Sequence, residues 1–390
     1  MMQEQVDLTL RNGVATALIA LTLVGMTCAQ RPVITVGGSN ANHTDLPAAV
    51  AAAVPGSVLQ VRPGNYTGFS TSKPLRIVLD FTAATGSVSA PVGSAYAIEI
   101  TGLAAGQQFA LVGRGASVNP GFLGAIRIVN SSGSVVLDSL TVTAGNAAVG
   151  LDVQNSANLL VQNSSVVGAP ALQVQDAVVV ASDVAFASLV GIGIFALRGA
   201  LEFGLGSYSG YRAPALRVQD STVRLAGNGT TPIRVTGSPQ QAVAAIEAIQ
   251  SDVRWLPSSF TVQPGGAGLA MTLVGGQAIP EEVPALVATS GPPGSPMSVA
   301  MTRPTAAPGL IVLGNLVLSH VAFGLPGVFW DESQFAVVLA VGTVDAAGLQ
   351  RQTVWPNAPW LLGELFCCQG VVVQPTGAML TSCAAAWLTL

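Results

Sequence analysis

A six-residue pattern returns six times in the middle of this chain. It reads small–apolar–x–apolar–x, often followed by Asn or Asp, and its copies span residues 125–130, 150–155, 171–176, 191–196, 215–220 and 245–250. The copies begin 25, 21, 20, 24 and 30 residues apart. Apolar and polar side chains that alternate with period two are typical of β-strands, and a repeat of this length indicates one turn of a β-solenoid.

Each copy predicts one strand of a stack. In the copy at 171–176, Leu172 and Val174 are expected to point into the solenoid and the two glutamines outward. Asn and Asp tolerate a left-handed backbone and can cap a bend with their own side chains. We therefore expect the chain to turn at the polar residue that ends four of the copies, namely Asn130, Asn155, Asp176 and Asp220.

The composition limits the range of partners. Half of the residues are hydrophobic and only 9% are charged, whereas ordinary soluble domains carry about 25% charge. The net charge is −4, Lys73 is the only lysine, and the arginines are scattered. Because the phosphate backbone is recognised by clustered positive charge, this composition excludes a nucleic-acid partner.

The N-terminus predicts export. Arg11 precedes an apolar run at 14–26, and small residues at 27–29 fit a cleavage site, so residues 1–29 are interpreted as a signal peptide. The run is too short to span a bilayer, and no transmembrane span is expected after its removal. The protein should then be secreted or held at the cell surface. An alternative is a lipid-anchored envelope protein, with the lipid on Cys28.

The segment at 46–67 combines an alanine-rich helix, a Pro55-Gly56 stop, a strand, and a turn at Pro63-Gly64-Asn65-Tyr66. It resembles the N-terminal signature of right-handed parallel β-helix proteins of the pectin-lyase-like superfamily, of the secreted bacterial type. The resemblance implies a right-handed parallel β-helix over residues 30–265. It also implies a relationship to polysaccharide lyases and glycoside hydrolases.

The last third of the chain has a different character. Residues 266–282 are rich in Gly and Pro and are interpreted as a linker. Beyond them the repeat is lost and the candidate strands lengthen, which predicts a small β-sandwich-like domain at 283–390. The fold class is therefore all-β, and this C-terminal β-module is similar to trailing modules of large secreted bacterial proteins.

The mature chain contains three cysteines, Cys367, Cys368 and Cys383. In an oxidising compartment Cys383 is expected to pair with one of the two adjacent cysteines. A metal site is the weaker interpretation, because the C-x₂-C spacing is missing and no histidine lies close in the sequence. No metal or cofactor is expected.

Catalysis by this superfamily needs clustered carboxylates or a base of altered pKa. The repeats contain no Asp-Asp pair and no histidine. No residue of this chain therefore matches a catalytic residue of the superfamily. The strongest polar alternative is Asp152 with Asp176 or Asp183, together with Arg127 or Arg217 on an outward face.

An aromatic segment at 200–212 gives the candidate ligand-binding residues. Tyr208 and Tyr211 can stack on sugar rings, while Arg212 and Glu202 can bond to sugar hydroxyls. Packing of this segment onto its own turn is the structural alternative. The sequence thus favours a non-enzymatic surface protein with a structural, adhesive or glycan-binding role and a polysaccharide or cell-surface glycan as partner. A polysaccharide lyase or glycoside hydrolase is the alternative.

Overall fold

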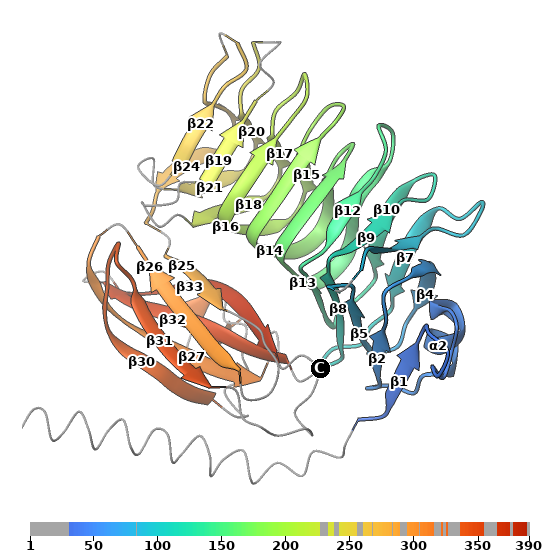
Figure 1. The fold of residues 1–390 in the computed structure, drawn as a ribbon. Helices are drawn as coiled ribbons and strands as arrows, with labels where there is room; N and C mark the ends of the chain where they lie inside the picture. The colour runs from blue at the N-terminus through green and yellow to red at the C-terminus, as the bar shows by residue number, and fades with distance from the viewer. Residues whose placement is uncertain are drawn as a thin grey trace, which may run out of the picture. The chain divides into compact units, whose positions relative to one another are not determined.

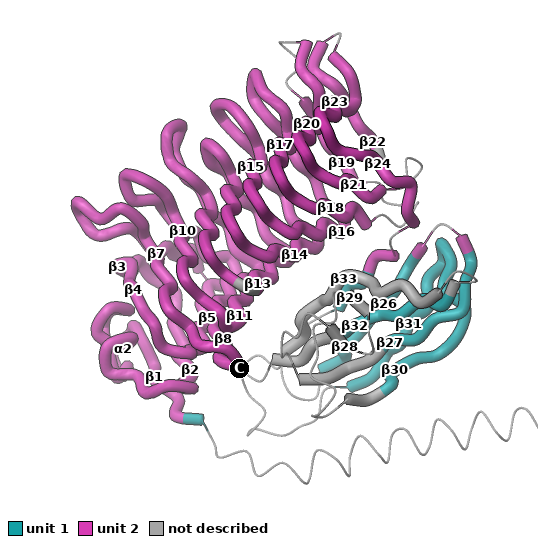
Figure 2. The backbone as a smooth tube through the Cα atoms, turned by 180° about the vertical axis from the view of Figure 1, so that it is seen from behind, with its two compact units in different colours: residues 1–31, 286–302, 306–390 teal, residues 32–285, 303–305 magenta. Residues whose placement is uncertain are grey.

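The structure is a computed structural model. It describes residues 31–82, 84–226, 233–237, 242–255, 260–266, 268–282, 284–288, 295–303, 305–315, 321–322, 325–326, 336–354, 365–374 and 377–387. The expected signal peptide at 1–29, and Cys28 within it, lie outside the described residues. The chain forms two compact units, one of residues 32–285 with 303–305 and the other containing 286–302 and 306–390 (Figure 2).

The unit of residues 32–285, which is magenta in Figure 2, is a parallel β-solenoid of about 10 turns. Its strands stack side by side from β1 to β24 (Figure 1), and each turn passes through three faces in the order 1, 2, 3. Three long strands bend through the corners and belong to more than one face, namely β13 (Val149–Gly168), β14 (Leu172–Ser188) and β16 (Ala200–Ser209). The predicted all-β solenoid is confirmed.

The three faces are ladders of parallel strands. Face 1 runs through β1 (Val33–Val36), β2 (Val58–Val61), β5 (Arg76–Asp80), β8 (Gln108–Arg114), β11 (Ser134–Asp138), the three long strands, β18 (Thr222–Ala226), β21 (Asp252–Trp255) and β24 (Gln277–Pro280). Face 2 runs through β3 (Asn65–Thr67), β6 (Gly86–Ser89), β9 (Ala116–Asn119), β12 (Thr141–Thr143), the long strands, β19 (Ile233–Thr236) and β22 (Phe260–Gln263). Face 3 runs through β4 (Phe69–Thr71), β7 (Tyr96–Thr101), β10 (Gly124–Val129), β13, β14, β15 (Ile194–Leu197), β17 (Leu216–Gln219), β20 (Ile246–Ile249) and β23 (Met271–Val274).

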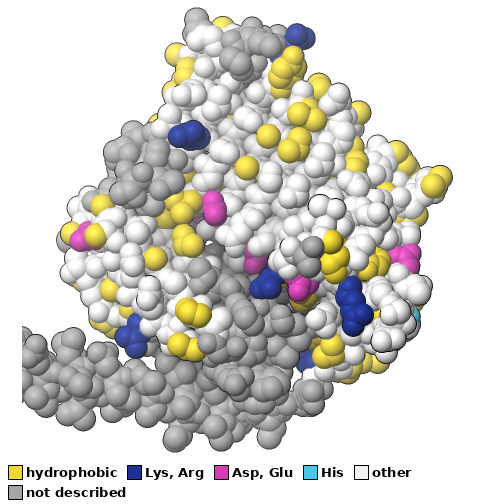
Figure 3. Space-filling model, in the orientation of Figure 1, with side chains coloured by type: hydrophobic (Ala, Val, Ile, Leu, Met, Phe, Trp, Pro, Cys, Tyr) yellow, Lys and Arg dark blue, Asp and Glu magenta, His cyan; other side chains and the backbone are white. Residues whose placement is uncertain are grey.

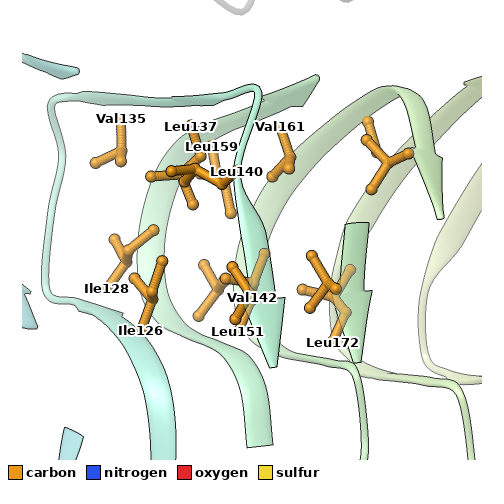
Figure 4. Close-up of a cluster of buried hydrophobic side chains, with 14 of the residues drawn as sticks. Ile126, Ile128, Val135, Leu137, Leu140, Val142, Leu151, Leu159, Val161 and Leu172 are labelled. Carbon is orange, nitrogen blue, oxygen red and sulfur yellow. The ribbon is translucent and has the colours of Figure 1, made fainter. Parts of the chain in front are cut away.

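The core consists of aliphatic columns that run along the solenoid. Ile126, Leu151 and Leu172 occupy one register position in three successive turns, and each is at most 1% exposed. Figure 4 shows such side chains gathered between the strands of neighbouring turns. Burial of each Leu, Ile or Val side chain contributes about 1.5–3 kcal/mol, so the alternating pattern supplies the main stabilising term.

One copy of the repeat is shifted relative to the prediction. Ile194 pairs in register with Leu172, and Ala196 pairs with Val174, so this strand starts two residues later than the pattern at 191–196 indicates. The bend after it falls on Arg198, which has a φ of 51°. The sequence pattern does not reveal this bend, because an arginine occupies the place that Asn or Asp holds in four of the other turns.

A short helix closes the start of the solenoid core. Helix α2 (Leu46–Ala52) begins where the Asp45 side chain accepts a hydrogen bond from the Leu46 amide at 2.8 Å, and Pro47 lies in its first turn. Its Leu46, Ala49 and Val50 are buried in the solenoid core. Lys73 donates from Nζ to three carbonyl oxygens at the end of the helix, including that of Ala53 at 2.8 Å. The predicted helix and its position are confirmed.

The segment expected as a linker at 266–282 belongs to the solenoid instead. It contains β23 and β24, which pair in parallel with β20 and β21 of the preceding turn. The repeat is hard to recognise here because the residues between β20 and β23 are rich in Gly and Pro and the strands are short.

The C-terminal unit, whose described residues are mostly teal in Figure 2, consists of small antiparallel sheets. One sheet orders β25 (Ala285–Ala288), β26 (Pro296–Thr302) and β31 (Leu349–Val354), and a pair joins β28 (Val321–Ala322) to β29 (Leu325–Pro326). The four-stranded sheet orders β30 (Ala336–Val344), β27 (Ala307–Asn315), β32 (Leu365–Gln374) and β33 (Gly377–Trp387). Among the described residues, Met297, Val299, Met301 and Ile311 contribute to a core separate from that of the solenoid.

Candidate functional site

The corner between face 3 and face 1 is built from one residue per turn with a left-handed backbone. Asn130, Asn155, Asp176, Arg198, Asp220 and Gln250 have φ values of 52°, 46°, 50°, 51°, 48° and 49°. Each follows a face-3 strand at the equivalent position, and each side chain is exposed. The four bends predicted from Asn and Asp are confirmed, and Arg198 and Gln250 complete the column.

Serine residues that lie next to the bend residues and are buried form hydrogen bonds with the backbone of this corner. The Ser156 hydroxyl donates to the Gln154 carbonyl at 2.8 Å, and the Ser221 hydroxyl donates to the Gln219 carbonyl at 2.6 Å. The Ser221 amide in turn donates to the Ser251 hydroxyl of the next turn at 3.0 Å. The first two hydrogen bonds close the bend within one turn, and the third is buried and links two successive turns, so together they hold the bend residues in a row.

A groove of about 940 Å³ runs along this corner, and we call it the corner groove. It is lined by the six bend residues and by Ser131, Ser132, Ser156, Ala177, Val178, Gly199, Ala200, Ser221, Thr222 and Asp252. Its lining is rich in amides, hydroxyls and carboxylates and contains no aromatic ring. Such a surface can exchange hydrogen bonds with a ligand over many successive positions.

The charges in the corner groove are arranged in sequence along it. Arg198 donates to both oxygens of Asp176 at 2.6 and 2.7 Å, and Asp220 follows at the bend of the next turn. The hydrogen bonds from Arg198 lower the pKa of the Asp176 carboxyl, and the pair raises the pKa of the Arg198 guanidinium. One turn further toward the N-terminus, the Asn155 amide donates to the Asn130 side-chain oxygen at 3.3 Å.

The outward side of face 3 carries the polar cluster that includes Arg127 and Asp152. Arg127 lies between Glu99 and Asp152 in the register, at 3.3 Å from the Glu99 carboxylate and 3.6 Å from that of Asp152. The Asp152 carboxylate is buried and accepts hydrogen bonds from the Tyr96 hydroxyl at 2.8 Å and from the Gln154 side-chain amide at 3.0 Å. Burial and the bond to Asp152 raise the pKa of Tyr96.

The other residues of the predicted polar face do not join this cluster. Arg217 lies on the same face, four strands along the ladder from Arg127, and its guanidinium pairs with Glu247 at 2.6 Å. Asp176 lies in the corner groove, and Asp183 lies at the corner between faces 1 and 2, where its φ is 53°. The expected grouping of Asp152 with Asp176 or Asp183 is therefore wrong, because Asp176 and Asp183 occupy left-handed corners of β14 and not the outward side of face 3.

The predicted ligand-binding segment is largely buried. Residues 200–209 form strand β16, and Tyr208 is 1% exposed, stacks on Phe186 and packs at a tilt against Phe203 in the core. Glu202 is also buried and pairs with Arg224 of the next turn at 3.3 Å. Only Tyr211 and Arg212 remain accessible, with the guanidinium over the ring at 5.4 Å. The four residues do not form one site, because Tyr208 follows the inward parity of its strand.

Many charged side chains of the described solenoid pair with an opposite charge on a neighbouring turn. Arg–carboxylate pairs join Glu99–Arg127–Asp152, Asp176–Arg198, Arg217–Glu247 and Glu202–Arg224–Glu281–Arg254. On the face drawn in Figure 3, charged side chains are few among the uncharged ones. Cross-strand pairs of opposite charge stabilise neighbouring strands, which accounts for most of these residues without a catalytic role.

In the C-terminal unit, Cys368 is a buried thiol whose pKa is raised by burial. The strand register places Cys383 opposite Gln369 and Cys367 opposite Ala385. A disulfide between Cys368 and Cys383 is therefore not formed, and pairing of Cys383 with Cys367 stays a prediction. Among the described residues, no group of three or more His, Cys, Asp or Glu side chains converges to hold a metal ion.

Comparison with known proteins gives no relative. The chain matches no known family, and neither the curated proteins nor the solved structures contain a significant match to it. In the part of the chain that the structure describes, no helix combines the length and hydropathy needed to cross a membrane.

Proposed function

We propose that this protein is a non-enzymatic, exported scaffold that binds a linear, hydroxyl-rich glycan along the corner groove. The observation that carries the proposal is the unbroken row of six exposed polar bend residues, one from each of six successive turns. Stacked turns repeat every ~4.8 Å, which is close to the length of one sugar unit in an extended chain. A glycan lying along the corner would therefore meet an equivalent polar side chain at each unit.

The chemistry of the row favours a neutral glycan. Amide groups at Asn130, Asn155 and Gln250 both donate and accept, as sugar hydroxyls do. The acids Asp176, Asp220 and Asp252 outnumber the single guanidinium of Arg198 in the lining. Because this excess of negative charge repels a polyuronate, the preferred partner is a neutral polysaccharide or cell-surface glycan.

Export and a pectin-lyase-like relationship belong to the same proposal. The segment at 1–29 has the features of a signal peptide, and the helix, stop and turn at 46–67 resemble the entry to β-helix proteins of that superfamily. A surface location would present the corner groove to extracellular glycans. The polysaccharide lyase or hydrolase alternative receives less support, because Asp152 and Glu99 are both engaged by Arg127.

The test is binding of the full chain to a panel of soluble glycans, measured by calorimetry. The panel contains linear neutral glycans of increasing length and polyuronates, and the same mixtures are assayed for new reducing or unsaturated ends. We expect neutral glycans to bind, with affinity that rises with chain length up to about six units. New chain ends would favour the enzymatic alternative, and absence of binding to every glycan would contradict the proposal.

Glycine variants localise the binding. Asn130→Gly and Asn155→Gly keep the left-handed backbone and remove only the amides. Loss of these hydrogen bonds should weaken binding roughly tenfold in the double variant. The matched control is Asn163→Gly, at a φ of 49° on the corner between faces 1 and 2, which should bind as the parent does. Equal loss in the control would place binding outside the corner groove.

A further inference from the structure

The two ends of the solenoid differ in how the core is covered and how the edge strands are hydrogen-bonded. At the N-terminal end, α2 covers the core, and the outer edge of β1 is already bonded. The Thr35 amide donates to the Asn42 side chain at 2.8 Å, and the His43 amide donates to the Thr35 carbonyl at 3.2 Å. These contacts satisfy backbone groups that an edge strand would otherwise present to another chain.

The C-terminal end has no comparable cover among the described residues. Leu273 of β23 is in register with Ala248 of β20, yet Leu273 is 39% exposed and Ala248 is fully buried. Strands β22, β23 and β24 each pair with a single described strand, that of the preceding turn. Within the described residues of the solenoid, the last turn therefore leaves both an open core and three unpaired strand edges.

These edges lack charged protection against pairing. Natural edge strands are commonly guarded by charged side chains, and lysine above all. The twelve residues of β22, β23 and β24 include no Asp, Glu, Lys or Arg. Leu269 and Val274 of the same turn are 66% and 54% exposed. The last turn is an uncharged, partly apolar surface that can meet an identical surface without repulsion.

We infer that the last turn of the solenoid, formed by β22, β23 and β24, is a self-association surface that docks on the last turn of a second copy of this chain. When two such ends face each other about a two-fold axis, their strands run in opposite directions, so the edges can pair as antiparallel strands. Burial of Leu273, Met271 and their counterparts would complete the core on both sides.

The asymmetry of the ends also determines the type of assembly. Head-to-tail stacking would require the edge of β1, which residues 42–43 already occupy. A contact between two like ends uses each surface once and closes, giving a dimer and not a fibre. This inference does not depend on the proposed glycan function, since the two surfaces share no residue.

Sedimentation of the full chain over a range of concentrations tests the inference. We expect a monomer–dimer equilibrium, and hydrogen exchange should show the amides of β22–β24 becoming protected as concentration rises. Leu273→Lys and Val274→Lys should each weaken dimerisation roughly tenfold or more, because like charges would face each other across the contact. Val274 is largely exposed, so its substitution leaves the fold intact, as circular dichroism would verify.

The matched control is Val33→Lys, which places the same charge on the 45%-exposed Val33 of β1 at the opposite end. It should dimerise as the parent does. A parent chain that stays monomeric at every concentration would overturn the inference. Protection of the last-turn amides in such a monomer would show that another part of the same chain covers this end. Equal loss of dimer in Val33→Lys would also overturn it.

Discussion

Arg198 and Asp176 occupy the same bend position in successive turns and join side chain to side chain, with Nε–Oδ1 and Nη2–Oδ2 distances of 2.6 and 2.7 Å. In a stack of equivalent positions, identical charged residues would face one another about 4.8 Å apart and repel. The corner instead places Asp, Arg and Asp at residues 176, 198 and 220. Opposite charges on neighbouring turns thus help to specify which turn lies next to which.

The Asp176–Arg198 pair predicts a pH-dependent contribution to stability. Arg198 holds the pKa of Asp176 below its ordinary value, so the contribution is fully present above that ordinary value. It should disappear as the pH falls through the lowered pKa, because the protonated acid no longer attracts the guanidinium. Carboxyl NMR titration should show the Asp176 midpoint rising in Arg198→Gln. The control Arg217→Gln, whose partner is Glu247, should leave that midpoint unchanged; an unchanged midpoint in both variants would contradict the prediction.

The left-handed bends predict that two substitutions at Asn155 destabilise the solenoid to different extents. Its φ of 46° strains a β-branched residue, so Asn155→Val should destabilise the solenoid by about 1–2 kcal/mol. Asn155→Gly accepts the same backbone and should cost only a few tenths of a kcal/mol. Urea denaturation followed by circular dichroism gives the comparison. Equal destabilisation by valine and glycine would show that the side-chain amide, and not the backbone, determines stability here.

Asp152 and Glu247 provide a test of buried against accessible ion pairs. Asp152 is buried and accepts from Tyr96 and Gln154, so Asp152→Ala should cost about 2–3 kcal/mol by leaving those donors unsatisfied. The Glu247 carboxylate pairs with the more exposed Arg217, and Glu247→Ala should cost less than about 1 kcal/mol. Urea midpoints of the two variants measure the difference. Similar midpoints would mean that the Tyr96–Asp152 hydrogen bond adds little to stability.

Much of the solenoid can be predicted from local patterns, because a single turn contains its own signal. The alternation at Leu172 and Val174 assigns inward positions, and Asn155 or Asp176 marks the bend that follows. The same reasoning fails where a turn departs from the pattern. Arg198 replaces Asn or Asp at a bend, and the short strands of the last turn lie among glycines and prolines.

The candidate site could not be predicted in the same way. The corner groove exists only because residues about one turn apart in sequence stack in space, and the length of the turns varies. The ion pairs of Arg127 and Arg217 depend on the same register. Tyr208 was misassigned because an aromatic residue near glycines resembles a loop in sequence, whereas the strand parity of β16 places it in the core.

The bend column has an evolutionary consequence. Because each of these six turns contributes one polar residue to the corner and one layer to the core, a whole turn is an exchangeable unit. Duplication of a segment such as 177–198, which runs from one bend to the next, would lengthen the molecule without altering any register on either side. The number of turns therefore sets the length of the corner row, and that length can change by gene duplication alone while the chemistry of each turn stays the same.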